Sequence, residues 1–180
     1  LKGYRVVGIQ RGYNGLLHGE TRELNERDVS NVIQRGGTVL YTARCLEFKE
    51  KKYQELGAAK CRELGVEGIV VIGGDGSYRG AQALSKNGIN VMCIPGTIDL
   101  DISCTEYTIG FDTAINTAME CIDKIRDTST SHSRVSIVEV MGRKAGFIAL
   151  YTGIAGGAED ILINERYDGN EQFIIDHIKR

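Results

Sequence analysis

Short apolar runs alternate with helical patterns along most of this chain, and this alternation limits the folds that it can adopt. The runs are rich in Val and Ile, and their lengths fit buried strands. They span residues 5–9, 38–41, 68–72, 90–94, 135–140 and 161–163. Strands and helices in alternation favour an α/β fold of the doubly wound class, in which a mostly parallel sheet has helices on both faces. Ligands of such sheets bind beyond the carboxyl ends of the strands.

Two stretches between the runs place apolar residues at helical spacing. One covers residues 53–64 and precedes Gly65, a residue type that is typical of helix C-termini. The other covers residues 115–125 and follows Asp112, which predicts an N-cap. We expect a third helix to include residues 81–85.

The composition and charge of the chain exclude several classes of protein. Of its 180 residues, 42% are hydrophobic and 26% are charged, which is typical of a globular protein rather than a disordered one. The formal net charge of −2 gives no general attraction to nucleic acid or anionic membranes, and no apolar run reaches the roughly 20 residues of a membrane span. The five cysteines lack CxxC spacing and the three histidines are far apart, so we expect free thiols and a cytoplasmic protein.

A glycine-rich segment, GGDGS at residues 73–77, follows the third apolar run and precedes the third helical stretch. Glycines let the backbone approach an anion closely, and a helix N-terminus provides N–H groups and the positive end of the dipole. Asp75 could hold a Mg²⁺ ion that bridges phosphate oxygens. The segment therefore fits a phosphate-binding loop, and the alternative is a tight turn with an N-capping acid.

A second loop carries two carboxylates and a hydroxyl. Thr97, Asp99 and Asp101 follow the apolar run that ends at residue 94. Residues two apart in an extended segment project to the same side, so we expect the two carboxylates to share one face. Phosphoryl transfer to an alcohol requires a carboxylate that accepts the hydroxyl proton and negative charge that holds a metal ion. The loop offers both, and the alternative is an acidic surface loop.

Three arginines are candidate phosphate ligands. Arg143 lies where the run at residues 135–140 is expected to lead into a helix, and Arg134 precedes that run. Arginine fits phosphate through a bidentate fork, and a cation at a helix N-terminus needs a compensating anion such as phosphate. Arg44 follows another apolar run and is a further candidate. Each could instead be a solvated surface residue.

Four segments, in this order and at this spacing, resemble the phosphofructokinase family, and most closely its bacterial allosteric type. They are GGDGS at 73–77, PGTID at 95–99, YTIGFDTA at 107–114 and VEVMGR at 138–143. The likeness continues through residues 35–38, 42–44, 126–128 and 156–159 and so covers nearly the whole chain. It implies one phosphofructokinase domain over residues 1–180, and a partial one, since the family's first strand with its ATP loop and its later sugar-site residues are missing.

The resemblance also implies an activity, which is transfer of the terminal phosphoryl group of ATP to fructose 6-phosphate in the presence of Mg²⁺. Asp99 would be the catalytic base and Asp75 the Mg²⁺ ligand. The implied sugar-phosphate site consists of Thr97, Ile98, Asp99, Arg134, Met141, Gly142 and Arg143. The implied ATP site consists of Arg44, Cys45, Gly74, Asp75, Gly76 and Ser77. The implied allosteric nucleotide site includes Arg126, Gly157, Ala158 and Glu159.

Several positions bear on the donor, on assembly and on activity. Glycine at positions 76 and 96 favours ATP, because pyrophosphate-dependent relatives typically carry Asp at the first position and Lys at the second. Arg134 matches a residue that reaches into a neighbouring subunit, which implies a homo-oligomer, usually a tetramer. Leu100 stands where the family almost always has Asn, and it removes a polar side chain between the two acids of the loop.

Other interpretations stay open at this point. A non-catalytic phosphofructokinase-like remnant that binds nucleotide or sugar phosphate would explain Leu100 and the missing segments. A pyrophosphate-dependent relative is a second alternative. Lipid and dinucleotide kinases share the Gly-Gly-Asp-Gly loop but not the segment that ends in Arg143. We expect the partial chain to expose apolar surface, to be poorly soluble or to self-associate, and to show no measurable turnover.

Overall fold

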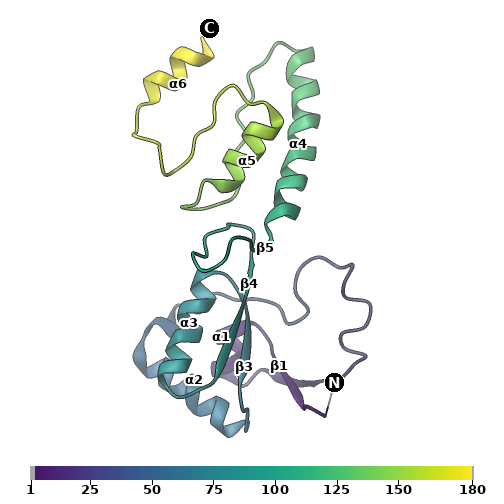
Figure 1. Ribbon diagram of the computed structural model, residues 1–180, viewed down its shortest axis with the longest axis vertical. Coiled ribbons are helices and arrows are strands. Elements are labelled where there is room, and N and C mark those ends of the chain that lie inside the picture. The colour runs from purple at the N-terminus through teal and green to yellow at the C-terminus, as the bar shows by residue number, and fades with distance from the viewer. Residues whose placement is uncertain (1–2, 180) are drawn as a thin grey trace. The chain divides into compact units, whose positions relative to one another are not determined.

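A computed structural model describes residues 3–179, which form two compact units (Figure 1). Unit 1 consists of the residues up to 71 together with 76–94, and unit 2 consists of 72–75 together with the residues from 95 onward. The chain therefore crosses between the units three times, after residues 71, 75 and 94, at or just beyond the ends of the third and fourth apolar runs. These are the positions where the sequence predicts ligand-binding loops.

Unit 1 begins with two paired strands and a short helix. β1 (Val6–Ile9) and β2 (Thr21–Leu24) are antiparallel, and α1 (Gly12–His18) lies between them in the sequence. α1 ends at Gly19, whose φ of 73° is in the left-handed region that glycine adopts at helix C-termini. The hairpin-like arrangement was not predicted, because residues 21–24 have no run of apolar residues.

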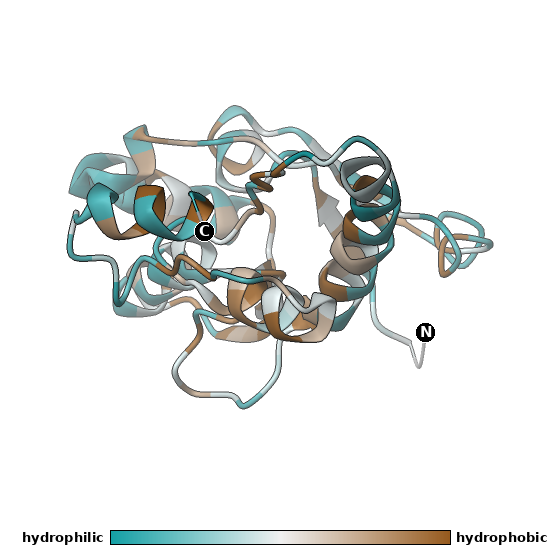
Figure 2. Ribbon diagram, turned by 90° about the horizontal axis from the view of Figure 1, so that it is seen from above, coloured by the Kyte–Doolittle hydropathy of each residue, from teal (hydrophilic) through white to brown (hydrophobic). Residues whose placement is uncertain are grey.

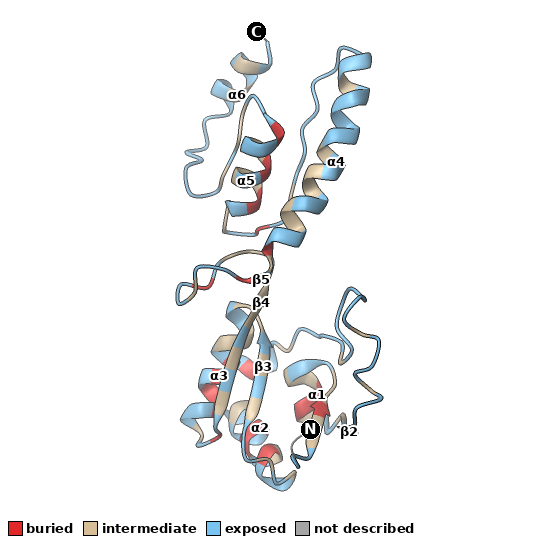
Figure 3. Ribbon diagram, turned by 45° about the vertical axis from the view of Figure 1, so that its right-hand side comes forward, coloured by how far each residue is buried: buried red, intermediate tan, exposed pale blue. Residues whose placement is uncertain are grey.

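The core of unit 1 lies among three helices. α2 (Lys51–Glu63) follows a short 3₁₀ helix, η1 (Glu47–Lys49), and α3 (Asp75–Lys86) follows the glycine-rich loop. Figure 3 shows buried residues on α1, α2 and α3. The buried cluster consists of Leu16, Phe48, Ala58, Cys61, Leu84 and Ile89. Burying such side chains contributes about 1.5–3 kcal/mol each for the larger ones, so this cluster is the main stabilising feature of unit 1.

A second sheet has three strands in the order β3 (Ile69–Gly73), β4 (Val91–Thr97) and β5 (Ile109–Gly110), and β4 and β5 run parallel. Side chains alternate between the two faces of β3 and β4, as strand geometry requires. One face packs against the unit 1 core, whereas the other face leaves Met92 73% exposed and Ile72 68% exposed. A parallel sheet normally has both faces covered, so this exposed apolar face is unusual.

Unit 2 contains the three remaining helices, α4 (Phe111–Ser131), α5 (Phe147–Gly156) and α6 (Glu171–Ile178). Figures 1 and 3 show α4 and α5 side by side, with the buried residues of α5 on the side that faces α4. These residues are Ile148, Thr152 and Gly156. Their spacing of four places them on one face of the helix.

Several predicted elements are confirmed. The chain has the predicted α/β fold, with a parallel strand pair flanked by helices. The runs at residues 5–9, 68–72 and 90–94 become β1, β3 and β4 within a few residues. The stretch at 53–64 becomes α2, and Gly65 after it has a φ of 65°, as expected for a helix stop.

Other predictions are wrong. Residues 38–41, 135–140 and 161–163 form no strand, and Ile137 is 84% exposed. A strand needs a neighbour that pairs its N–H and C=O groups, and apolar alternation alone does not supply one. Asp112 is not an N-cap, because α4 begins one residue earlier and is capped by Gly110 with a φ of 107°. Asp112 instead lies in the first turn, where a carboxylate interacts favourably with the helix dipole.

The helices carry both polar and apolar residues (Figure 2). No helix within residues 3–179 is long and apolar enough to cross a membrane. None of the five cysteines, all of which lie within residues 3–179, forms a disulfide bond, as predicted.

Candidate functional site

The glycine-rich loop has the predicted strand-to-helix geometry. β3 ends at Gly73, and α3 begins at Asp75. The N–H groups of the first turn of α3 therefore start within residues 73–77, the segment that the sequence predicts to bind phosphate. A Cβ atom on Gly74 would lie 3.3 Å from Cβ of Thr97, so glycine at this position permits close approach of the two predicted loops. At Gly76, by contrast, an added Cβ would meet no atom within 4 Å.

Tyr13 of α1 holds the first turn of α3 in place. Its hydroxyl donates a hydrogen bond to the carbonyl oxygen of Ser77 at 2.6 Å, and its ring stacks on Phe48 with centroids 4.4 Å apart. A side chain at Gly80 would collide with the Tyr13 ring. Burial raises the pKa of the Tyr13 phenol, so the hydroxyl stays protonated and remains a donor. No local pattern predicts this contact, because Tyr13 and Ser77 are far apart in the chain.

The loop after β4 is only partly as predicted. β4 extends through Thr97, which lies opposite Gly110 of β5. The hydroxyl oxygen of Thr97 accepts a hydrogen bond from the backbone N–H of Asp99 at 3.2 Å. The predicted extended geometry between Asp99 and Asp101 is wrong, because Leu100 between them has a φ of 54°. A left-handed residue turns the chain, so the sharing of one face cannot be inferred from alternation.

The acids of this loop and Arg143 nevertheless influence one another. Burial raises the pKa of the half-buried Asp99 carboxyl, the charge of Asp101 raises it further, and the charge of Arg143 lowers it. The structure thus brings together three of the predicted functional side chains within unit 2. A carboxylate with a raised pKa is a better proton acceptor at neutral pH than an ordinary aspartate.

Arg143 reaches this position from a turn and not from a helix. The predicted strand-to-helix junction is wrong here, because α5 begins only at Phe147. Gly142 has a φ of 145° and Arg143 a φ of 54°, and the N–H of Ala145 donates to the carbonyl oxygen of Gly142 at 2.8 Å. A side chain at Gly142 would collide with the Ala145 carbonyl oxygen. Met141, the preceding member of the implied sugar-phosphate site, is 73% exposed.

Arg134 follows the C-terminal end of α4 in the sequence and precedes the turn that contains Arg143. Its backbone N–H donates to the carbonyl oxygen of Ser129 at 2.9 Å. The side chain lines a hollow of about 290 Å³ together with Lys124, Ile125, Thr128, Ser129 and Ser136.

Two of the residues assigned to the allosteric site are neighbours. A Cβ atom on Gly157 would lie 3.8 Å from Nη2 of Arg126. Gly157 caps α5 with a φ of 63°, and the N–H of Ala158 donates to the carbonyl oxygen of Gly153 at 2.8 Å. Glu159 follows on the exposed surface. A cation and a carboxylate thus lie near the C-terminal end of one helix.

Arg44 and Cys45 belong to unit 1. Arg44 is exposed, whereas Cys45 packs against the buried cluster of that unit. Of the other implied ATP-site residues, Gly74, Asp75, Gly76 and Ser77 are consecutive around the start of α3.

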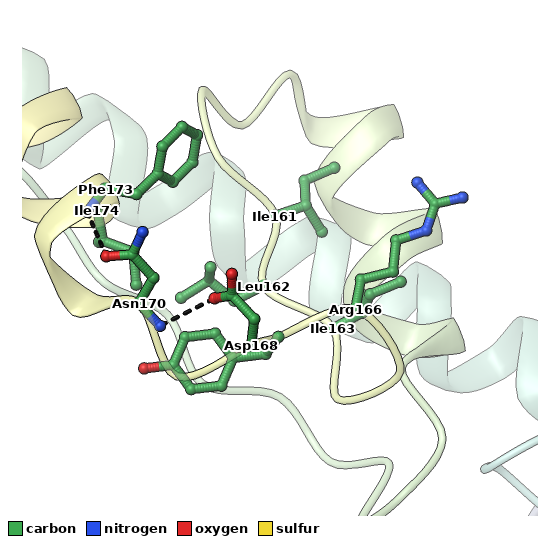
Figure 4. Close-up of a pocket in the computed structure, with 9 residues that line it drawn as sticks. Ile161, Leu162, Ile163, Arg166, Asp168, Asn170, Phe173 and Ile174 are labelled. Carbon is green, nitrogen blue, oxygen red and sulfur yellow. Dashed lines mark hydrogen bonds between the residues drawn. The ribbon is translucent and has the colours of Figure 1, made fainter.

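A hollow of about 330 Å³ in unit 2 contains none of the predicted site residues (Figure 4). Its polar side chains serve the start of α6. Asn170 accepts a hydrogen bond from the N–H of Phe173 at 3.4 Å, and Asp168 accepts one from the N–H of Asn170 at 2.9 Å. These bonds cap a helix, so the hollow offers mainly apolar side chains to a ligand.

The described part of the chain, residues 3–179, contains no group of three or more His, Cys, Asp or Glu side chains arranged to hold a metal ion. Mg²⁺ at phosphoryl-transfer sites is usually bound by one or two carboxylates and by the substrate's own phosphates. Asp75 is the first residue of α3, beside the open space at Gly76, and fits that mode of binding.

Comparisons with known proteins agree on one family. A family model described as phosphofructokinase matches residues 1–180. An ATP-dependent 6-phosphofructokinase of Clostridium botulinum is 61% identical over 92% of this chain and 52% of its own length. The crystal structure of Pichia pastoris phosphofructokinase in the T-state has a TM-score of 0.88 and is 34% identical, covering 98% of this chain and 21% of that one.

A pyrophosphate-dependent phosphofructokinase from Marinobacter aquaeolei also matches, with a TM-score of 0.70 and 25% identity over 95% of this chain and 47% of its own. The fold is therefore compatible with either phosphoryl donor. The chain spans about half the length of the curated relatives it matches.

Proposed function

Because the chain belongs to the phosphofructokinase family, we propose that it supplies the phosphoryl-transfer loops of an ATP-dependent 6-phosphofructokinase. The reaction moves the terminal phosphoryl group of ATP to fructose 6-phosphate and gives fructose 1,6-bisphosphate and ADP. One observation carries the proposal. The pKa of the half-buried Asp99 carboxyl is raised by burial and by the charge of Asp101 and lowered by the charge of Arg143, and the Asp99 backbone N–H donates to the Thr97 hydroxyl.

In this proposal Asp99 accepts the proton of the attacking sugar hydroxyl on a carboxylate oxygen. The raised pKa brings the group closer to the ideal value for a general base at neutral pH. Thr97 fixes the Asp99 backbone through the 3.2 Å hydrogen bond. Arg143 supplies positive charge for the phosphate of the sugar through its planar guanidinium. Thr97, Ile98, Met141 and Gly142 complete the proposed sugar-phosphate site around these two side chains.

The proposed ATP site lies at the start of α3, where Gly74, Asp75, Gly76 and Ser77 meet the helix N-terminus. The amides and helix dipole there favour phosphate oxygens. Asp75 would hold Mg²⁺, which neutralises charge that develops on the transferred phosphoryl group. Arg44 and Cys45 are also proposed as nucleotide contacts.

Support for ATP as the donor comes from the two glycines. Gly76 has open space around its Cβ position, so the backbone conformation does not require glycine there. A Cβ atom on Gly96 would lie 3.0 Å from Cγ2 of Ile72, so a larger residue would press on β3. The fold therefore does not require glycine at position 76. The space that this glycine leaves open favours an extended donor such as ATP over a compact one such as pyrophosphate.

We extend the proposal to assembly and control. Arg134 matches a family residue that reaches into a neighbouring subunit, so it is proposed to serve the sugar-phosphate site of a neighbouring copy in a homo-oligomer, usually a tetramer in this family. Arg126, Gly157, Ala158 and Glu159 are proposed to form part of an allosteric nucleotide site. A cytoplasmic location follows from the glycolytic reaction, and neither nucleic acid nor membrane is a proposed partner.

The test is an assay of the complete polypeptide with ATP and with pyrophosphate, in which ³¹P NMR identifies the phosphorylated sugar. We expect fructose 1,6-bisphosphate from ATP and at least a hundredfold slower turnover with pyrophosphate. Gly76→Asp, which the open space tolerates, should weaken ATP binding without unfolding the protein. Faster turnover with pyrophosphate would favour the pyrophosphate-dependent alternative, and binding without turnover would favour the non-catalytic one.

A further inference from the structure

Leu100 has a backbone conformation that its side chain disfavours. Its φ of 54° lies in the left-handed region, where the Cβ atom crowds the following carbonyl oxygen and residues other than glycine lose roughly 1–2 kcal/mol. Asparagine and aspartate are several-fold enriched in this region, and leucine is not. Arg143, which acts on the same carboxyl group, also has a φ of 54°. Two disfavoured residues therefore lie at the proposed site.

The surrounding contacts leave the loop little freedom to avoid this turn. On one side, Thr97 is the last residue of β4 and lies opposite Gly110 of β5. On the other side, Ile102 is only 7% exposed, and its carbonyl oxygen accepts a hydrogen bond from the N–H of Thr105. Four residues connect these two fixed points. A strained conformation persists where the surroundings determine it on both sides, as they do here.

The turn also determines where the acid of the loop lies. Ile98 is held next to Gly110, since a Cβ atom on that glycine would lie 3.3 Å from Cγ2 of Ile98. The place of Asp99 is then determined by two features. Its backbone N–H donates a hydrogen bond to the Thr97 hydroxyl oxygen, and the left-handed φ of Leu100 sets the direction of the chain that follows. An extended or right-handed residue 100 would carry Asp101 and the buried Ile102 to a different place.

We propose that Leu100 is a positioning residue whose left-handed turn sets the place of the Asp99 carboxylate, and that leucine makes this turn strained. The role of Asp99 in this inference rests on the proposed function, whereas the left-handed turn does not. It replaces the expectation that position 100 matters through a missing polar side chain. What the position requires is a residue that tolerates a positive φ.

The first test compares the melting temperatures of Leu100→Ala, Leu100→Gly and Leu100→Asn in the 180-residue chain. Alanine keeps the strain and removes the half-buried side chain, so it is the reference. We expect the Gly and Asn variants to melt about 2–4 °C above the Ala variant, since each relieves roughly 1 kcal/mol of strain. Leu46 is the matched control, because its φ is −68°. There the Gly variant should melt below the Ala variant.

The second test measures positioning through the titration of the Asp99 carboxyl carbon by ¹³C NMR. The Leu100→Asn variant should keep the raised pKa of Asp99. Leu100→Pro cannot adopt a positive φ, and the β-branched Leu100→Val strongly disfavours it, so both should move that pKa towards the ordinary aspartate value. Circular dichroism would show which of the two variants is folded and therefore informative.

The outcomes separate the inference from the proposed function. Gly and Asn variants that melt at or below the Ala variant would overturn the strain, and an unchanged Asp99 titration in a folded Pro or Val variant would overturn the positioning. Neither measurement uses ATP or sugar phosphate. If both results are as expected while the complete polypeptide fails to phosphorylate fructose 6-phosphate, the inference stands and the proposed function does not.

Discussion

Replacing Gly142 by alanine should destabilise the Arg143 turn more than its small size suggests. The added Cβ atom would collide with the carbonyl oxygen of Ala145, a backbone atom that cannot rotate away. The φ of 145° is also one that residues with a Cβ atom rarely adopt, at a cost of about 1–3 kcal/mol. If the turn opens to relieve the collision, the 2.8 Å hydrogen bond from Ala145 to Gly142 is lost, which costs about 0.5–1.5 kcal/mol more.

The sum is about 2–4 kcal/mol, which corresponds to a fall in melting temperature of roughly 5–15 °C for a chain of this size. Gly76→Ala is the matched control. It lies within α3 with no atom near its Cβ position, so alanine should stabilise the chain by about 0.5–1 kcal/mol. Thermal denaturation followed by circular dichroism measures both. Equal melting temperatures for Gly142→Ala and the unmodified chain would refute the geometry described for the Arg143 turn.

Three other substitutions test separate contacts. Thr108→Val should raise the free energy of unfolding by about 1 kcal/mol, because the buried Thr108 hydroxyl has no hydrogen-bond partner among the described residues. Urea titrations measure this change, and a loss of stability would show that the hydroxyl does have a partner. Tyr13→Phe removes the 2.6 Å bond to Ser77 and should cost about 0.5–1.5 kcal/mol, and no change would mean that the bond does not hold α3. Asp101→Asn removes a charge that raises the pKa of Asp99, so ¹³C NMR should show that pKa falling; a rise would contradict the assigned sign. A carboxyl whose pKa is raised by folding contributes stability that is lost as the pH rises through that pKa. With a smaller shift at Asp99, the Asp101→Asn variant should lose less stability than the unmodified chain between acidic and neutral pH.

The sequence predicted the glycine-rich loop better than it predicted the strands. The Gly-Gly-Asp-Gly segment lies between β3 and α3 as expected, because a strand, a turn and a helix start each leave a local signal. Residues 135–140 have equally strong strand character but form none. Strand formation depends on a neighbour elsewhere in the chain, and no local pattern reports whether that neighbour is present.

For the site, the sequence proposes residues but not their geometry, and their roles stay a prediction. The structure adds that the charges of Asp101 and Arg143 both influence Asp99. No sequence pattern predicts the positive φ values of Leu100 and Arg143, because leucine and arginine rarely adopt the left-handed region. Tyr13 was missed for a different reason, because its bond to Ser77 joins residues from separate helices.

The central claim, that Asp99 is the catalytic base, is tested most directly by the turnover of Asp99→Asn in the complete polypeptide. Asparagine keeps the shape and hydrogen bonding of the side chain but cannot accept the hydroxyl proton. The kcat should fall roughly a hundredfold to ten-thousandfold, while the KM for fructose 6-phosphate stays nearly unchanged. Asp75→Asn is the control, since a defect in metal binding should shrink as Mg²⁺ is raised and the Asp99→Asn defect should not. An Asp99→Asn variant that retains full kcat would contradict the account.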